Sequence, residues 1–223
     1  ALNFSFTPGT DGLLVAMVAG DGGSSGITSM IWDDGTHKFP MYQAASAAGN
    51  NVAAFAHIYY LDNPTVGSGT IKATQAGTIS RSVVGALYAT GAGDFTEFAT
   101  NSLNPSGDLI AGPITATSEA LVITVAGHSA NKFESGGIVG GGDTLLYMTV
   151  PNNSGAGASY IIDSGSGGLY SAQWKNDDAQ SEAVVIASFA VGPPTPQANI
   201  LAFDFGAYGP AKIDQATKQI TKA

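Results

Sequence analysis

A short apolar segment that occurs twice constrains the fold of this chain more than any other feature. Residues 14–20 read Leu-Val-Ala-Met-Val-Ala-Gly, and residues 121–127 read Leu-Val-Ile-Thr-Val-Ala-Gly. Each half also closes on a second related segment, Val83–Ala89 in the first half and Val184–Ala190 in the second. Apolar runs of this length, bounded by glycine-rich turns, are typical of covered β-strands. The repetition therefore predicts two related halves, built to one strand plan and joined in a single β-sandwich.

Further strand signals follow one another along the chain. We expect strands over residues 2–7, 13–19, 27–32, 37–42, 51–61, 70–75, 82–90, 108–117, 120–126, 144–150, 158–163, 169–175 and 182–191. Asp33-Asp34-Gly35-Thr36 predicts a hairpin turn. Helical character is weak, because only residues 44–48 and 177–183 are suited to a helical turn or two. The expected fold class is all-β, an antiparallel, jelly-roll-like β-sandwich of two related halves with a short C-terminal β tail.

Composition excludes several classes of function. Only 11% of the residues are charged, the net charge is −9, and the eight basic residues are scattered, so we expect no nucleic-acid partner. The absence of cysteine excludes disulfides, thiolate nucleophiles and cysteine-based zinc sites. No apolar run reaches the roughly 18 to 20 residues of a membrane helix, so we expect no membrane insertion.

A proline-rich segment divides the chain near its C-terminal end. Pro193-Pro194-Thr195-Pro196 predicts a stiff connector, which gives a sandwich over residues 1–192, a linker over 193–198 and a tail over 199–223. The tail is too short to bury a core of its own. It is either a β-strand arm that joins a neighbouring subunit or the start of a truncated second domain. The apolar residues expected to contact a partner are Ile200, Leu201, Phe203, Phe205, Ile213 and Ile220.

Several motifs occur in a characteristic order: Leu13–Gly20, Ile27–Trp32, Ile-Tyr-Tyr-Leu-Asp-Asn-Pro over residues 58–64, Gly69–Ile71 and Val83–Gly91. Together they resemble a repetitive jelly-roll or Ig-like β-sandwich domain of phage virion proteins and large bacterial surface proteins. The chain has Tyr59 where that family has Trp, and Trp32-Asp33-Asp34-Gly35 in place of Trp-Asn-Gly. The C-terminal segment is similar to the start of a bacterial Ig-like repeat. The resemblance implies a structural or adhesive role and brings no catalytic residues with it.

Candidate catalytic and metal-ligating residues are few. Gly22–Gly26 fits the pattern G-x-S-x-G, but the expected strand that follows is not the helix that a nucleophile elbow requires. The three histidines share no ligand spacing. Asp21, Asp33 and Asp34 are the candidate calcium ligands, because calcium takes carboxylate and carbonyl oxygens from loops. The alternative is that these aspartates cap the backbone of their own turns. No other cofactor is expected.

These observations predict a non-enzymatic structural protein of an exterior, repetitive assembly. We expect it in a phage virion, as a capsid decoration or tail-associated protein that contacts copies of itself or another structural protein. The alternative is an extracellular carbohydrate-binding or adhesive module of a bacterial cell surface, with a glycan as partner. Tyr170 and Trp174 are then the candidate sugar-stacking rings, because polar side chains flank them. A hydrolase, the third alternative, requires converging carboxylates or a Ser/His pair.

Overall fold

The computed structural model describes residues 5–6, 12–22, 26–49, 53–64, 67–75, 77, 81–103, 107–129, 133–140, 142–149, 155–176, 181–191 and 197–204. This part of the chain is all-β, and every strand pair that it contains is antiparallel. The predicted fold class, an antiparallel β-sandwich, is confirmed. None of these residues belongs to a helix long and apolar enough to cross a membrane.

The strands form four sheets, which we name A to D. Sheet A has the order β1 (Ser5–Phe6), β7 (Gly69–Gln75), β3 (Ile27–Asp33), β4 (Lys38–Pro40). Sheet B has the order β17 (Gln197–Asp204), β8 (Arg81–Thr90), β2 (Gly12–Asp21), β6 (Ala54–Asp62), β5 (Tyr42–Ala48). Sheet C has the order β13 (Thr144–Thr149), β14 (Gly155–Ile162), β11 (Leu121–His128), β16 (Glu182–Val191), β9 (Ala92–Leu103). Sheet D has the order β10 (Gly107–Ala116), β15 (Gly168–Asn176), β12 (Ser135–Val139).

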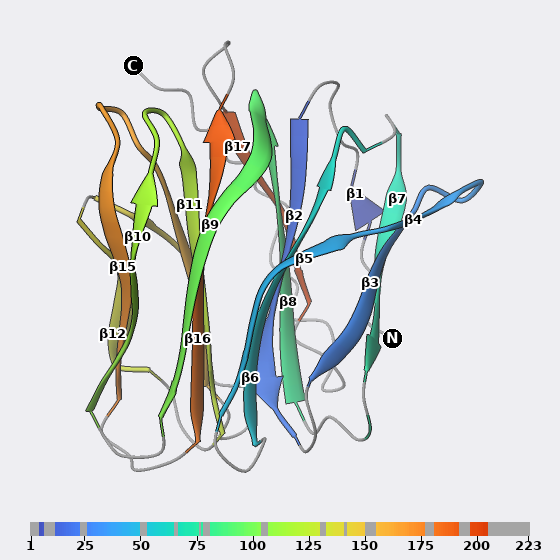
Figure 1. Cartoon of the computed structure of the whole chain (residues 1–223). Helices are drawn as coiled ribbons and strands as arrows, with labels where there is room; N and C mark the ends of the chain where they lie inside the picture. Colours follow the sequence, from blue (N-terminus) through green and yellow to red (C-terminus); the bar gives the residue numbers. More distant parts are fainter. Residues whose placement is uncertain are drawn as a thin grey trace.

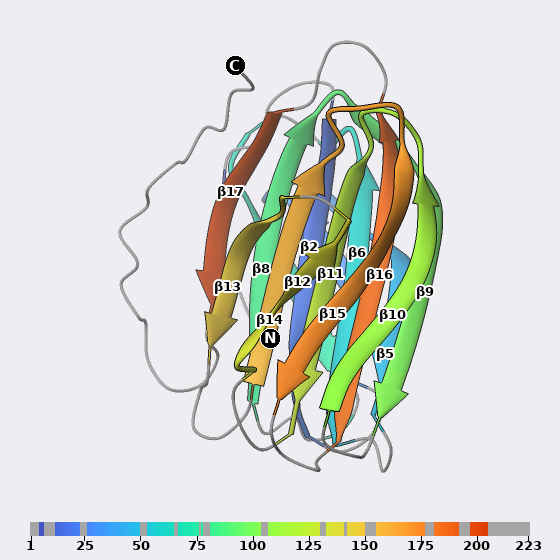
Figure 2. The same ribbon diagram turned by 90° about the vertical axis from the view of Figure 1, so that its left-hand side faces the viewer.

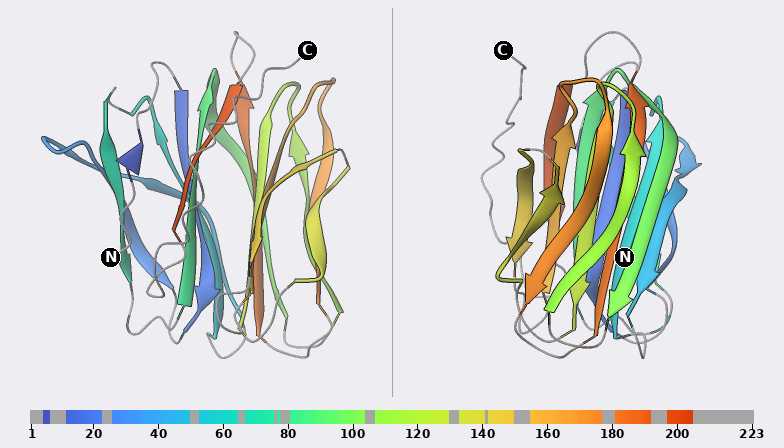
Figure 3. Two further views of the ribbon diagram at one scale, coloured as in Figure 1. Left: turned by 180° about the vertical axis from the view of Figure 1, so that it is seen from behind. Right: turned by 60° about the vertical axis from the view of Figure 1, so that its left-hand side comes forward.

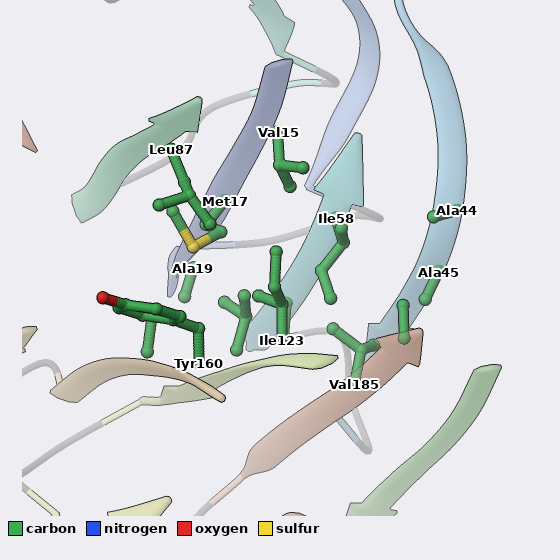
Figure 4. Packing of buried hydrophobic residues seen from close by; sticks show 14 of the residues in the cluster. Val15, Met17, Ala19, Ala44, Ala45, Ile58, Leu87, Ile123, Tyr160 and Val185 are labelled. Carbon is green, nitrogen blue, oxygen red and sulfur yellow. The ribbon is translucent and has the colours of Figure 1, made fainter. Parts of the chain in front are cut away.

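The sheets lie in four layers, with A packed on B, B on C and C on D (Figure 1). A rear view shows the same order of layers (Figure 3). One apolar core fills each of the three spaces between them. In the central core, Val15, Met17 and Leu87 of sheet B face Ile123 and Val185 of sheet C (Figure 4). The two inner sheets are therefore covered on both faces.

The repeated apolar segments form the middle strands of these inner sheets. Along β2, Leu13, Val15 and Met17 point into the central core, while Leu14, Ala16 and Val18 point toward sheet A. Successive side chains of a strand point to opposite faces, so a strand buried on both faces must be apolar at almost every position. β11 alternates in the same way between the central core and the core under sheet D. The double burial explains the continuous apolar character of both segments.

The two halves share one topology. In sheet B, β2 pairs with β6 and β8, and β5 pairs with β6. In sheet C, β11 pairs with β14 and β16, and β13 pairs with β14. In sheets A and D, β7 pairs with β1 and β3, as β15 pairs with β10 and β12. The chain is thus a duplicated sandwich whose two copies pack back to back through sheets B and C.

The last strand of each half is exchanged with the other half. β9 follows β8 after the single residue Gly91, whose φ of 71° suits glycine, but it pairs with β16 in sheet C. β17 comes after β16 along the chain, and its backbone pairs with β8 in sheet B. Both strands lie at the same place, next to β8 or β16 at the edge of an inner sheet. Part of the predicted partner-binding tail therefore pairs within its own chain.

Three elements differ from the strand prediction. β9 and β12 were not expected, because their sequences are rich in polar residues and glycine and lack an apolar run. β5 is a strand where residues 44–48 were expected to form a helical turn. Its pairing with β6 supplies backbone hydrogen bonds that outweigh the weak helix propensity of five residues. Most of the second candidate helix lies outside the described residues, and its last two positions begin β16.

Removing β17 tests the exchange. A chain that ends at Val191 lacks β17, so sheet B loses its edge strand and one edge of β8 is left unpaired. We expect a lower urea midpoint than for the full chain, together with aggregation through the open edge, measured by circular dichroism and light scattering.

A chain that ends at Asp204 keeps β17 and is the matched control, expected to unfold like the full chain. Equal midpoints for all three chains would show that β17 adds nothing to the stability of sheet B.

Candidate functional site

Three exposed apolar side chains lie on the outer face of sheet D. They are Ile110 on β10, Val139 on β12 and Leu169 on β15, with exposed fractions of 44%, 50% and 65%. Their neighbours along each strand, among them Leu109 and Ile138, point inward and are buried. The three strands lie side by side (Figure 2), and by strand alternation the exposed side chains are on the same face of the sheet. We call this surface the D face.

A shallow groove of about 340 Å³ crosses the D face beside Val139. Its lining includes the polar side chains of Asp108, Asp143, Gln173 and Lys175. Gln173 donates a hydrogen bond to the Asp108 carboxylate, and the Asp143 carboxylate accepts one from the backbone of the β12 strand at 3.0 Å. The groove therefore combines an apolar wall with carboxylates and one ammonium group.

The duplicated half offers a comparison, because sheet A occupies the place of sheet D. The outer positions of β7 carry Thr70, Lys72 and Thr74, and Lys72 forms an ion pair with Asp33 at 2.6 Å. Ile31 is the apolar residue of β3 that points outward there, and it is half-buried. The same fold thus tolerates a polar outer face. The exposed apolar side chains of the D face are not required by the architecture.

The proposed sugar-stacking residues lie in a core. Trp174 has no exposed surface and Tyr170 has 6%, and both pack between sheets D and C. Trp174 Nε1 donates a hydrogen bond to Thr124 Oγ1 at 3.2 Å, and Thr124 Oγ1 in turn donates to the Val185 carbonyl at 3.0 Å. Neither ring is available to a sugar in this structure, and we correct this assignment. Successive side chains of a strand point to opposite faces, so the polar neighbours of the two rings point to solvent while the rings point into the core.

Two glycines make room for the Trp174 ring. A Cβ atom on Gly136 or on Gly157 would lie 2.2 Å or 2.1 Å from a ring carbon, closer than such atoms approach. The indole is thus held between β12 and β14, and glycine is required at both positions.

The three candidate calcium ligands are not brought together. Asp21 ends β2 at the lower end of sheet B, and Asp33 and Asp34 lie at the distant β3–β4 hairpin (Figure 1). Asp33 and Asp34 accept backbone hydrogen bonds from Gly35, Thr36 and His37, which is the turn-capping role. The bond from Lys72, followed by that from Gly35, lowers the pKa of Asp33. Among the described residues, no three His, Cys, Asp or Glu side chains cluster as metal ligands.

The predicted partner-binding residues fall at or beyond the limit of the described chain. Ile200, Leu201 and Phe203 belong to β17, whose backbone alone is described. Phe205, Ile213 and Ile220 lie outside the described residues. Their role in binding a partner remains a prediction.

The sequence did not point to a pair of ionisable residues that occupies one position in both halves. In sheet B, Asp21 and Arg81 are cross-strand partners and form an ion pair of 3.8 Å that is partly exposed. Burial raises the pKa of Asp21, and Arg81 opposes that effect. The corresponding partners in sheet C are His128 and Glu182, which are fully buried with Nε2 and Oε1 3.4 Å apart. An alignment of the two apolar repeats, residues 14–20 with 121–127, shows that His128 is the equivalent of Asp21.

Burial governs the protonation of these inner groups. It raises the pKa of Glu182 to about 8 and lowers that of His57 to about 4. A neutral His57 agrees with its hydrogen bond, in which Nε2 accepts from the backbone of Ile27 at 3.4 Å. His128 and Glu182 have no exposed surface, so a substrate cannot touch either side chain in this structure. The pair therefore belongs to the interior of the fold and not to a surface that a ligand can reach.

The raised pKa of Glu182 predicts a pH-dependent stability. Between about pH 4.5 and 8 the folded state holds a proton that the unfolded state has released, so the free energy of unfolding falls as pH rises. Glu182→Gln cannot ionise. We expect urea unfolding to show that its stability relative to the wild type grows across this range, by on the order of a few kcal/mol.

Glu134→Gln is the control, because this carboxylate lies on the surface beside Lys175. Its pH profile should follow that of the wild type. A Glu182→Gln profile parallel to the wild type would show that this carboxyl does not titrate with a raised pKa.

Trp174→Ala should destabilise the fold by about 3–5 kcal/mol, because it empties a site closed on every side. Urea unfolding measures the loss. Leu169→Ala, on the same strand but exposed, should change stability by about 0.5 kcal/mol or less. A loss of that same small size for Trp174→Ala would contradict the packing described above.

The chain matches no protein-family model, no curated protein and no solved structure. Its function is therefore inferred from its own residues.

Proposed function

We propose that this protein is a structural subunit of a repetitive exterior assembly, in which the D face of one copy contacts the D face of another. The observation that carries the proposal is the set of exposed apolar side chains on that face, Ile110, Val139 and Leu169. In the strand register these side chains alternate with Gln173, Ser171 and Thr115, so the face mixes large apolar and polar groups, as many protein interfaces do. The polar outer face of sheet A supports it, because the same architecture does without such side chains there.

The polar groups of the groove suit contact between identical copies. In a two-fold interface, a residue of one copy meets a different residue of the other copy, and the reverse contact follows by symmetry. Lys175 and the carboxylates of Asp108 and Asp143 lie on one face, so each copy offers both signs of charge to its partner. An apolar centre with a polar rim is the usual anatomy of an interface.

The remaining features agree with an exterior building block. The two halves exchange strands and share a core, which joins them into one structural unit. The content of charged residues, 11%, is low. With the resemblance to phage virion domains, these features favour a capsid decoration or tail-associated protein, and a bacterial surface fibre otherwise.

The solution mass of the full chain tests the contact. We expect the wild type to associate as its concentration rises from micromolar to millimolar, measured by light scattering. Val139→Asp with Leu169→Asp should leave a folded monomer, because burying two carboxylates in the contact is unfavourable.

Thr28→Asp with Thr74→Asp adds the same charge to the outer face of sheet A and should leave the association unchanged. A wild type that stays monomeric, or equal effects of the two double variants, would contradict a D-face contact. Immunogold labelling of purified virions tests the location, and unlabelled virions would favour the cell surface.

The adhesive alternative no longer depends on Tyr170 and Trp174. A separate group of aromatic rings, on another edge of the molecule, favours a carbohydrate-binding role.

A further inference from the structure

Four aromatic rings form a row that crosses the junction between the two halves. Tyr42 on β5 lies 5.7 Å from Tyr60 on β6, measured between ring centroids. Tyr60 lies 5.9 Å from Phe95 on β9, and Phe95 lies 6.0 Å from Phe98. The row thus passes from sheet B to sheet C at the edge where β5 and β9 meet, on the right in Figure 2. We call it the aromatic row.

Strand register and a bulge place these rings on one side. Tyr42 and Tyr60 are direct cross-strand partners, so their side chains share a face of sheet B. Phe95 and Phe98 pair with Phe189 and Ala187, both of which point into the central core. A register shift between these pairs allows two residues three positions apart to point the same way. An unbroken strand would send them to opposite faces.

The row is exposed at its ends and supported in its middle. Tyr42 has an exposed fraction of 64% and Phe98 one of 52%. Of the Phe, Tyr and Trp rings whose exposure is described, these two alone are exposed. The buried ring of Phe189 packs against both Tyr60 and Phe95, with ring centroids 5.5 Å and 5.9 Å apart. The middle rings are thus held in place without a ligand, which lowers the entropic cost of binding.

Polar groups flank the row on the same side. On β6 the next residue on the face of Tyr60 is Asp62, and on β9 the next on the face of Phe98 is Thr100. Both residues are exposed. Their carboxylate and hydroxyl groups, with the phenol of Tyr42, are partners for hydroxyl groups of a ligand.

We propose that the aromatic row binds a neutral glycan chain. The apolar C–H face of a sugar ring packs on an aromatic ring, while its hydroxyls need hydrogen-bond partners at the rim. The exposed rings at the two ends of the row, Tyr42 and Phe98, offer two stacking positions to a sugar chain. The half-buried rings of Tyr60 and Phe95, which stack on each other, connect them. The row is one ring wide and has polar neighbours, which suits a linear chain better than the broad patch of a protein partner.

Charge selects a neutral glycan over an anionic one. The chain carries a net charge of −9, and Asp62 lies beside the row. An anionic sugar would be repelled by both. The site is separate from the D face, so binding of glycan and association of copies are independent properties.

The test uses the full chain and a panel of neutral hexasaccharides, namely cellohexaose, maltohexaose and the N-acetylglucosamine hexamer. We expect at least one of them to bind, as measured by calorimetric titration and by NMR shifts confined to β5, β6 and β9. Tyr42→Ala and Phe98→Ala should each weaken this binding about tenfold or more. Both residues are exposed, so the variants should unfold like the wild type.

Leu169→Ala removes an exposed apolar side chain from the D face and is the matched control, expected to leave glycan binding unchanged. Binding of none of the three sugars, equal losses in all three variants, or binding of a hyaluronan hexasaccharide alone would overturn the proposal. If Tyr42→Ala instead lowers the solution mass and no sugar binds, the row is a contact between copies. That result would leave the D-face contact to its own test.

Discussion

Burial of the two inner sheets on both faces is the constraint on which the rest of the structure depends. β2 and β11 contribute alternate side chains to two cores each, so every position along them is apolar, small or paired. Each outer sheet needs an inner sheet to cover its apolar side, and each inner sheet needs the other. With the exchange of β9 and β17, this arrangement makes the two halves mutually dependent.

Because the two halves share one topology, residues at corresponding positions of the two halves can be compared. The partly exposed pair Asp21–Arg81 and the buried pair His128–Glu182 occupy corresponding register positions. Only the second lies where burial raises the pKa of the carboxyl to about 8. The outer faces of sheets A and D differ in the same manner, one polar and one with exposed apolar side chains. Because the two halves have the same fold, a difference between their side chains at corresponding positions indicates a role in function or in local stability.

Local patterns predicted most of the strands because those strands have an apolar period of their own. β2, β8, β11 and β16 were predicted within a few residues. β9 was missed, because half of its twelve residues are polar, no apolar run stands out, and its pairing partner β16 is far along the chain. The turn role of Asp33 and Asp34 was weighed beforehand, and the structure shows it. The burial of Trp174 was not foreseen, because polar neighbours in a strand say nothing about which face is covered.

The sequence by itself determined the all-β class, the two related halves and the middle strands, because each depends on periodicity and turn residues within a short segment. Tertiary structure decided the four layers and the exchange of edge strands, since these depend on pairings between distant segments. It also decided both candidate surfaces. Ile110, Val139 and Leu169 share one face only because β10, β12 and β15 are adjacent. Tyr42 reaches Phe95 through Tyr60 only because sheets B and C pack together.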